Sequence, residues 1–368
     1  MQRYAVIMAG GSGERFWPAS RQARPKQLLR LTDPERTMLG EAIDRIAPLI
    51  PPERVLIATN EILAEPIRRG LPEIPPENVI AEPAKRNTAA CLALATAHLR
   101  HRYGDAPVAM AVLTADHKIA DPERFRQTVD AALTFAESND ALVTIGVRPT
   151  RPETGYGYIE IETKLAPASG APSPADVRPV ARFREKPDLA TAREFAISGH
   201  HLWNSGMFFW RTDTLTQGFI KHMPALATAL PVLTTAIASA NHSGLLSCFS
   251  ALDDTSIDVG LMERAANVHV IPASFAWDDV GAWDALSRTR ECDPQGNVAT
   301  GDPVLIESRD CIVYNEAGPD QIALALVGVR DLVVAATADA VLVCARDRVQ
   351  DVRRAVAELR RTGRGNKT

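Results

Sequence analysis

The sequence predicts an α/β fold with a doubly wound, mostly parallel sheet, followed by a small β-rich module. Strand-like apolar runs and helical segments alternate through the first half of the chain. A glycine-rich loop follows the first apolar run, and short apolar runs fill most of the chain from residue 298 to residue 346. Alternating strands and helices favour a parallel sheet, whose ligands bind beyond the carboxyl ends of the strands.

The first half supplies five apolar runs typical of buried strands. We expect these strands near residues 4–9, 54–59, 78–81, 107–114 and 141–147. Between them, helical apolar spacing runs over residues 37–48, 89–103 and from 121 onward. Asn87 or Thr88 can cap the second of these helices, because their side chains accept hydrogen bonds from free backbone amides.

The rest of the chain divides near residue 294. Residues 156–162 and 179–184 are expected to pair as strands around a connector at 165–178 that is rich in Ala, Pro and Ser. Helices resume from 188 and over 213–240, and a turn-rich junction at 294–297 follows. We therefore predict one domain over residues 1–293 and a second over 294–368. Apolar residues at 349, 352, 356 and 359 share one face of a terminal helix, which we expect to pack on this module or on a partner subunit.

Composition excludes several classes of protein. The chain has 368 residues and a formal net charge of −4, which gives no overall attraction for nucleic acid or an anionic membrane. No apolar segment is long enough to span a bilayer, and the start is not organised as a signal peptide. The five cysteines are scattered without CxxC spacing, so we expect reduced thiols, no zinc site and a cytoplasmic location.

The glycine-rich loop suits a polyphosphate. Backbone amides in such a loop form a concavity for phosphate oxygens, and the following basic side chains add positive charge. The glycines are Gly10, Gly11 and Gly13, and the cations are Arg15, Arg21, Arg24 and Lys26. Phe16 replaces the third small residue of a dinucleotide fingerprint, and the Gly-Lys-Ser/Thr of a P-loop is absent.

Taken whole, residues 10–27 (GGSGERFWPASRQARPKQ) closely resemble the signature of the sugar-nucleotide pyrophosphorylases, in its guanylyltransferase form. The resemblance implies a nucleotidyltransferase fold and transfer of GMP from GTP to mannose 1-phosphate, which gives GDP-mannose and pyrophosphate. It also implies Mg²⁺ as cofactor, a C-terminal module like a left-handed β-helix, and a homodimer formed through that module. Some relatives carry a metal-binding isomerase domain; this tail lacks the His/Glu cluster for it, so we expect no isomerase activity.

Such a reaction aligns two anions that repel each other, so it needs cations and a metal-binding carboxylate pair. The resemblance assigns Arg15 to the triphosphate and Lys26 to the transferring phosphoryl group. Asp116, in LTADH, and Asp279, in WDDVG, match the family's Mg²⁺ ligands. Other interpretations stay open: Asp116 can be a turn or cap residue, while Asp278 and the histidine at 117 are expected to be structural.

Further predicted contacts involve the rest of the nucleotide, including the guanine base. The resemblance places the nucleotide against the backbone from Ala9 through Gly13 and against the segment from Glu82 to Thr88. Glu82 can accept from the N1–H and amino group of guanine, and such complementarity discriminates strongly between bases. Asn87 is either a nucleotide contact or a helix cap, and both roles are compatible.

For the sugar, the resemblance points to Gly157, Glu185, Lys186 and Asn204. A carboxylate and an amide can bind sugar hydroxyls, and an ammonium can meet the sugar phosphate. An exposed ion pair is the alternative for Glu185 and Lys186, and Asp258 is expected to be structural. Two other functions compete: nucleotidyl transfer to a different sugar 1-phosphate, and a non-catalytic nucleotide-sugar sensor.

Overall fold

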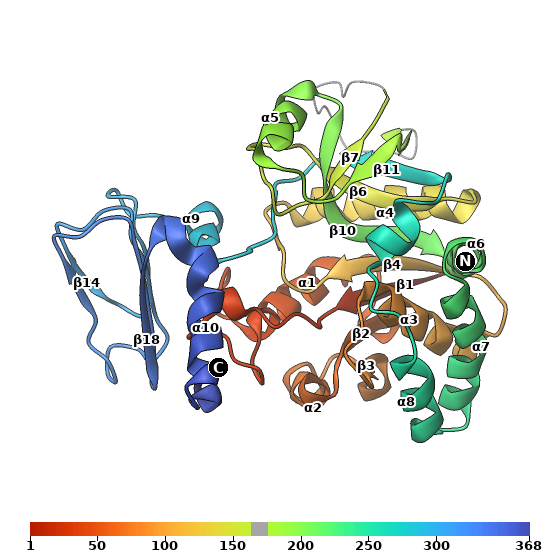
Figure 1. Ribbon diagram of the computed structural model, residues 1–368, viewed down its shortest axis with the longest axis horizontal. Helices are drawn as coiled ribbons and strands as arrows, with labels where there is room; N and C mark the ends of the chain where they lie inside the picture. The colour runs from red at the N-terminus through yellow and green to blue at the C-terminus, as the bar shows by residue number, and fades with distance from the viewer. Residues whose placement is uncertain (163–175) are drawn as a thin grey trace. The chain divides into compact units, whose positions relative to one another are not determined.

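The computed structural model describes residues 1–162 and 176–368, which form two compact units (Figure 1). The first unit contains residues 1–9, 43–114 and 119–276, and the second contains 10–42, 115–118 and 277–368. Most of the connector expected at 165–178 lies outside the described residues.

The first unit is built on a twisted sheet with the strand order β3-β2-β1-β4-β10-β6-β11-β8. Its strands are β1 (Gln2–Met8), β2 (Val55–Asn60), β3 (Val79–Glu82), β4 (Val108–Thr114), β6 (Leu142–Val147), β8 (Arg178–Pro179), β10 (His201–Arg211) and β11 (Val268–Pro272). Strand β1 runs parallel to β2 and β4, while β10 runs antiparallel to β4 and β6. The expected mostly parallel α/β sheet is confirmed.

Strands β7 (Tyr158–Glu160) and β9 (Arg182–Arg184) pair antiparallel, as the sequence predicts. Two further short strands are β5 (Lys118–Ile119) and β12 (Trp277–Asp278).

Helices cover both faces of the main sheet, with α3 and α7 on one face and α4 on the other (Figure 1). The helices of this unit are α2 (Glu61–Gly70), α3 (Thr88–Tyr103), α4 (Pro122–Ser138), α5 (Leu189–Ser198), α6 (Thr212–His222), α7 (Pro224–Ala238) and α8 (His242–Ser250). The central strands bury apolar side chains against α3 and α7, with Val6, Met110 and Leu94 in one continuous core. This burial fixes the strand ends from which the functional loops leave.

The second unit contains a β-helix-like module, drawn in blue in Figure 1. Strands β13 (Val298–Thr300), β15 (Ile312–Asn315) and β17 (Leu332–Thr337) pair in parallel, as do β14 (Val304–Ile306) and β16 (Ala325–Val327). Left-handed backbone at the corners, for example at Gly301 and Asp302, turns the chain between walls. Strand β18 (Ala340–Ala345) returns antiparallel to β17. The expected β-helix-like module is confirmed.

The glycine-rich loop and the end of the chain share one core within this second unit. Helix α10 (Val352–Arg361) buries Val352 and Val356 in the same cluster as Phe16 and Trp17. Helices α1 (Met38–Ile46) and α9 (Leu286–Thr289) complete the α-helices of the described residues. The predicted boundary after residue 293 stays a prediction; the compact units divide differently because residues 10–42 pack with residues 277–368.

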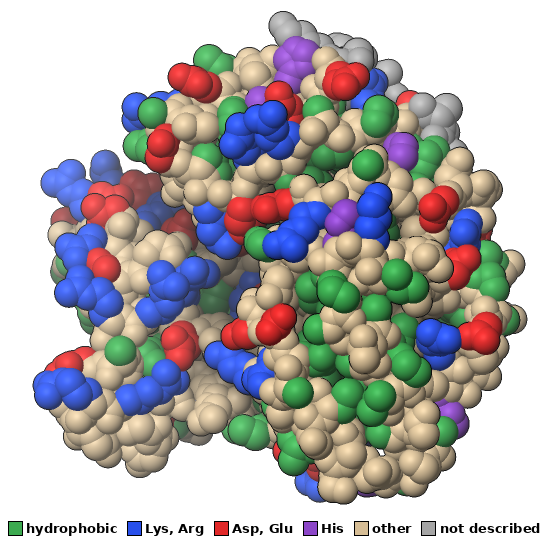
Figure 2. Space-filling model, turned by 45° about the vertical axis from the view of Figure 1, so that its right-hand side comes forward, with side chains coloured by type: hydrophobic (Ala, Val, Ile, Leu, Met, Phe, Trp, Pro, Cys, Tyr) green, Lys and Arg blue, Asp and Glu red, His purple; other side chains and the backbone are tan. Residues whose placement is uncertain are grey.

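In the described ranges, 1–162 and 176–368, no helix combines the length and apolarity needed to cross a membrane. Figure 2 shows Lys and Arg side chains interspersed with Asp and Glu over the face in view. This mixture accords with the small net charge of −4.

Candidate active site

A polar cavity of about 340 Å³ lies in the second unit. Its lining residues come from the glycine-rich loop, two aspartate-containing loops and α10: Ser12, Gly13, Glu14, Arg15, Lys26, Asp116, His117, Asp279, Gly281 and Arg353. The four predicted catalytic residues, Arg15, Lys26, Asp116 and Asp279, therefore line one cavity although they come from three distant segments of the chain.

Lys26 connects the three segments that carry these residues. Its ammonium donates to Asp116 Oδ2 at 2.9 Å and to the backbone carbonyl of Asp279 at 2.6 Å, which joins segments 90 and 253 positions away in sequence. The Lys26 side chain is only 7% exposed. Gly13 has a φ of +60°, and a Cβ there would lie 2.5 Å from Lys26 Cβ. The loop therefore reaches this shape because glycine allows both the backbone angle and the close approach.

The Asp116 carboxylate is held in its charged form. Burial by itself would raise the pKa of Asp116, but the neighbouring Lys26 ammonium and His117 lower it below its ordinary value. His117 accepts a hydrogen bond from Trp277 Nε1 at 3.0 Å through its Nδ1. This bond orients the imidazole ring; His117 also lines the cavity, so its structural role stays a prediction.

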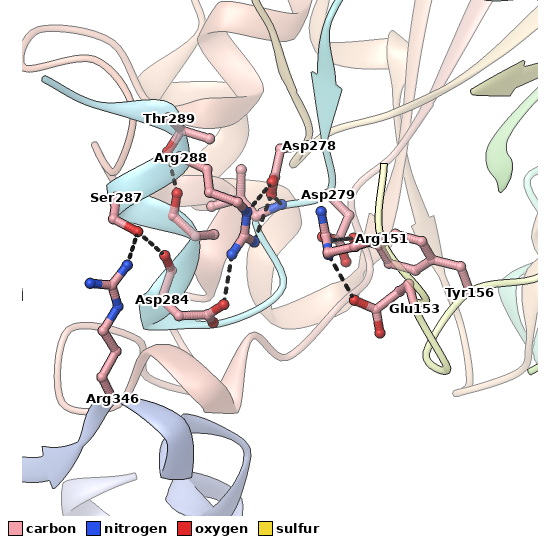
Figure 3. Close-up of polar contacts among 12 residues, drawn as sticks. Arg151, Glu153, Tyr156, Asp278, Asp279, Asp284, Ser287, Arg288, Thr289 and Arg346 are labelled. Atoms are coloured by element: carbon pink, nitrogen blue, oxygen red, sulfur yellow. Dashed lines mark hydrogen bonds and ion pairs between the residues drawn. The ribbon is translucent and has the colours of Figure 1, made fainter. Parts of the chain in front are cut away.

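The two neighbouring aspartates at 278 and 279 differ in their surroundings. Asp278 is buried and accepts from the Val280 amide at 2.8 Å and from Arg288 Nε at 2.7 Å (Figure 3). Val280 has a φ of +47°, a conformation that costs a β-branched residue about 1–3 kcal/mol and needs support from its surroundings. The Asp278 contacts supply this support, so Asp278 shapes the loop while Asp279 lines the cavity.

The arginines of the glycine-rich loop fall into two groups. Arg15 donates to the Gly281 carbonyl at 3.3 Å, and its buried Nε has no hydrogen-bond partner within the described part of the chain. Arg21 instead pairs with Asp339 at 2.9 Å, and Arg24 pairs with Glu316. These last two arginines hold the loop against the β-helix-like module, whereas Arg15 keeps donor capacity at the cavity.

The backbone groups at the start of the glycine-rich loop differ in how far they are already hydrogen-bonded within the protein. The Ala9 amide donates to the Ala58 carbonyl at 2.8 Å, and its own carbonyl accepts from Thr59 at 3.0 Å. These bonds extend the sheet beyond β1 and occupy both backbone groups of Ala9. Gly10 and Gly11 are exposed, and the Gly11 carbonyl accepts from Gln27 at 3.2 Å.

The residues predicted to contact the base belong to the first unit. Glu82 ends β3, where burial raises its pKa to about 7 although the Cys91 thiol donates to it. The Asn87 side chain accepts from the Thr88 amide at 2.9 Å at the start of α3, and Thr88 Oγ1 accepts from the Ile257 amide at 2.9 Å. Both side chains therefore have structural hydrogen bonds, and the Asn87 bond is the one that the capping interpretation expects.

The predicted sugar-binding residues form a cluster in the first unit. Asn204 donates from its backbone amide to the Gly157 carbonyl at 2.8 Å and from its side chain to Asp258 at 2.7 Å. A Cβ on Gly157 would lie 2.5 Å from Glu185 Oε2, so a larger residue there would push that carboxylate out of its present position. Lys186 donates to Glu185 at 2.6 Å. Burial raises the pKa of Asp258, and the nearby Glu185 charge raises it further.

The sequence analysis did not single out two arginines that the structure places beside predicted site residues. The Arg151 guanidinium lies 5.8 and 5.1 Å from the ring centroids of Tyr156 and Trp203. It donates to Glu153 at 3.3 Å (Figure 3). Its position just before the predicted sugar loop was the available signal. Arg353 lines the cavity from α10, and no motif near it pointed there.

The α/β sheet of the first unit and, in the second unit, the cavity lined by cations and aspartates beside the glycine-rich loop are both typical of a nucleotidyltransferase. The family model described as nucleotidyl transferase matches residues 4–295, and one described as a mannose-phosphate isomerase/GMP-like β-helix domain matches 301–359.

Comparison with individual similar proteins shows which nucleotidyltransferases this chain resembles. The mannose-1-phosphate guanylyltransferase of Escherichia coli K12 is 38% identical over 98% of this chain and 74% of its own length. The xanthan biosynthesis protein XanB of Xanthomonas campestris is 36% identical over 99% of this chain and 74% of its own length. A Thermus thermophilus structure, described as mannose-1-phosphate geranyltransferase, has a TM-score of 0.85 and 36% identity over 98% of this chain and all of that one. The chain belongs to the mannose-1-phosphate guanylyltransferase family of nucleotidyltransferases.

Proposed function

We propose that this protein transfers GMP from GTP to α-D-mannose 1-phosphate, giving GDP-mannose and pyrophosphate. The observation that carries the proposal is the cavity lined by Arg15, Lys26, Asp116 and Asp279 in a chain of this family. A phosphate oxygen of mannose 1-phosphate attacks the α-phosphorus of GTP, and the bond from that phosphorus to the bridging oxygen breaks. Pyrophosphate leaves with the electron pair, so the protein need supply no covalent nucleophile.

The cations neutralise the charge that opposes this displacement. Lys26, held by Asp116 and the Asp279 carbonyl, places a fixed ammonium among the residues that line the cavity. We assign it to the oxygens of the transferring phosphoryl group, and we assign Arg15 to the triphosphate. Fixed donors of this kind stabilise a transition state because they need no reorganisation during the reaction.

Nucleotidyl transferases generally use a divalent metal ion. We propose Mg²⁺, held by Asp116 and Asp279, since both line the cavity and carboxylate oxygens suit this hard cation. No group of three His, Cys, Asp or Glu residues that could hold a metal occurs among residues 1–162 and 176–368. A two-carboxylate site fits Mg²⁺, which commonly keeps water and phosphate oxygens as its other ligands. When bound, the ion would supply additional positive charge to the phosphates.

Base and sugar selection are assigned to the first unit. We propose that Glu82 accepts from guanine and that Asn87 and Thr88 support the nucleotide while keeping their helix-start bonds. We assign Gly157, Glu185 and Asn204 to the sugar and Lys186 to its phosphate. The contacts among Gly157, Glu185 and Asn204 support this assignment, because they hold a carboxylate and an amide in one place.

We further propose a cytoplasmic homodimer formed through the C-terminal module. The outward side chains of β14, β16 and β18 are apolar and more than half exposed: Val304, Ile306, Val327, Val341 and Val343. Exposed apolar patches of this kind often mark interfaces. Sedimentation analysis of the protein and of a Val343→Glu variant tests the dimer, which the charge should weaken.

The proposed reaction is tested by pyrophosphate release from purified protein across GTP, ATP, UTP and dTTP, each with mannose 1-phosphate or glucose 1-phosphate. We expect GTP with mannose 1-phosphate to give the highest kcat/KM. A higher kcat/KM with another sugar would favour the alternative transferase, and no turnover with tight GDP-mannose binding would favour the sensor. Removal of divalent metal with a chelator should abolish turnover, and excess Mg²⁺ should restore it.

A further inference from the structure

We infer that Arg353, on the C-terminal helix α10, binds the β- and γ-phosphates of GTP and therefore also the pyrophosphate product. This inference rests on the proposed function, because it requires a nucleoside triphosphate in the cavity. It adds a substrate-binding cation that lies outside residues 4–295, the part of the chain matched by the nucleotidyl transferase family model.

The position of Arg353 is the first observation. Its side chain lines the cavity that also contains Arg15 and Lys26, and it is exposed. Within the described residues it has no hydrogen bond or ion pair. The next residue, Arg354, has an acidic partner, Asp351, at 3.6 Å. The two adjacent arginines therefore differ in that Arg354 has an acidic partner, whereas Arg353, at the cavity, has none among the described residues.

The charge balance of the cavity is the second observation. Three acidic residues line it: Asp116 is paired with Lys26, Glu14 is paired with Arg360 at 2.7 Å, and Asp279 is assigned to the metal ion. Arg15 and Arg353 have no carboxylate partner among the described residues, and the buried Arg15 Nε lacks any hydrogen-bond partner there. Two arginines with unused donors at one polar cavity suit a dense anion, since guanidinium binds phosphate in a bidentate manner.

The packing of α10 is the third observation. Val352 and Val356 are buried in the core that includes Phe16 and Trp17. Trp17 Nε1 also donates to the Lys367 carbonyl at 2.7 Å. The glycine-rich loop and α10 are therefore packed together within the second unit, so Arg353 keeps its place beside the loop. A cation on a fixed element needs little ordering to bind its ligand.

The position of Arg353 on the substrate follows from the other assignments. Lys26 and the two aspartates are assigned to the transferring phosphoryl group and its metal, and Arg15 to the triphosphate. A further exposed cation at the cavity suits the terminal phosphates, which carry the most charge and leave together. The β-helix-like module and its helix thus bind substrate in addition to supporting the fold.

The reverse reaction gives the sharpest test, because pyrophosphate is then a separate substrate. Full-length wild-type protein and the variants Arg353→Ala, Arg353→Lys and Arg354→Ala are assayed with GDP-mannose and pyrophosphate. We expect Arg353→Ala to raise the KM for pyrophosphate about tenfold, toward the lower end of the effect of a charge-assisted hydrogen bond because the site is exposed. The KM for GDP-mannose should stay within about twofold, and Arg353→Lys should recover part of the loss. Arg354→Ala, the matched control, should resemble the wild type.

Calorimetric titration with inorganic pyrophosphate and Mg²⁺ supplies a readout that does not depend on turnover, and it should show the same weakening in Arg353→Ala. An unchanged pyrophosphate affinity in Arg353→Ala would overturn the inference, as would an equal loss in Arg354→Ala. A fall in kcat alone would also contradict it. If the wild-type protein makes no GDP-mannose from GTP but still binds pyrophosphate through Arg353, the proposed function fails and the binding site stands.

Discussion

Replacing Lys26 with alanine should abolish most turnover at a modest cost in stability. The Lys26 side chain is 7% exposed, and its partner Asp116 is 33% exposed. The change removes the 2.9 Å ion pair and the 2.6 Å bond to the Asp279 carbonyl, and it leaves the Asp116 charge at the cavity without its ammonium partner. An unpaired negative charge would also repel the phosphates of both substrates.

The two effects have different sizes. Breaking a buried ion pair by removing one partner costs about 3–5 kcal/mol, and the exposure of Asp116 reduces this to about 1–3 kcal/mol. Loss of one fixed donor to the transition state lowers kcat by about 10²- to 10³-fold. Lys26→Met should give the same loss of kcat with better packing, because its unbranched side chain retains most of the lysine volume.

Lys118→Ala is the matched control. Lys118 lies in the same unit and pairs with Glu41 at 2.7 Å, with side-chain exposures of 25% and 13%, but it does not line the cavity. Pyrophosphate release measures kcat, and thermal unfolding measures stability. We expect both alanine variants to lower the melting temperature by several degrees and only Lys26→Ala to lose turnover. Activity of Lys26→Ala within about threefold of the wild type would refute the catalytic assignment, and so would an equal loss in Lys118→Ala.

Three further predictions concern other parts of the site. Burial raises the pKa of Glu82 to about 7, so the charged form that accepts from guanine is lost as the pH falls below that value. The KM for GTP should therefore rise at lower pH. Glu82→Gln should flatten this pH profile and weaken the preference for GTP over ITP about tenfold. Gly157→Ala would displace the Glu185 carboxylate, so the KM for mannose 1-phosphate should rise severalfold while the KM for GTP stays constant; equal changes in both would contradict the sugar assignment. Arg288→Ala removes the 2.7 Å bond to buried Asp278, so the free energy of unfolding should fall by about 1–3 kcal/mol, measured by thermal unfolding. The kcat should fall about tenfold. An unchanged kcat would show that Asp278 does not position the Asp279 loop.

The sequence was most informative where function depends on local chemistry. The spacing of glycines and cations in residues 10–27 pointed to phosphate binding without knowledge of the fold. Continuous apolar runs located β1, β2, β3, β4 and β6 of the central sheet, because a strand buried on both faces is apolar along its length. The strands β10 and β11 of the same sheet were not predicted. The short runs after residue 297 likewise indicated the β-rich module, and the parallel pairing of β13, β15 and β17 confirmed it.

Contacts between distant segments were harder to predict. In the sequence, only the resemblance to the family's motifs linked Asp116 with Asp279. The structure shows that both residues line the same cavity. Arg21, Arg24 and Arg15 look alike in the sequence, but only Arg15 lacks an acidic partner among the described residues. The different roles of these arginines depend on Asp339 and Glu316, which lie 318 and 292 positions further along the chain from their partners.

The amino-acid sequence by itself determined the fold class, the family and the types of side chain available for phosphate chemistry, because these follow from apolar periodicity and from a contiguous loop. The tertiary structure alone decided which charges are neutralised and which keep free donors. Ion pairing depends on distances between segments remote in sequence, and the pattern of apolar residues along the chain does not indicate those distances. Arg353 belongs to the cavity for that reason: its helix packs on the glycine-rich loop through Val352 and Val356.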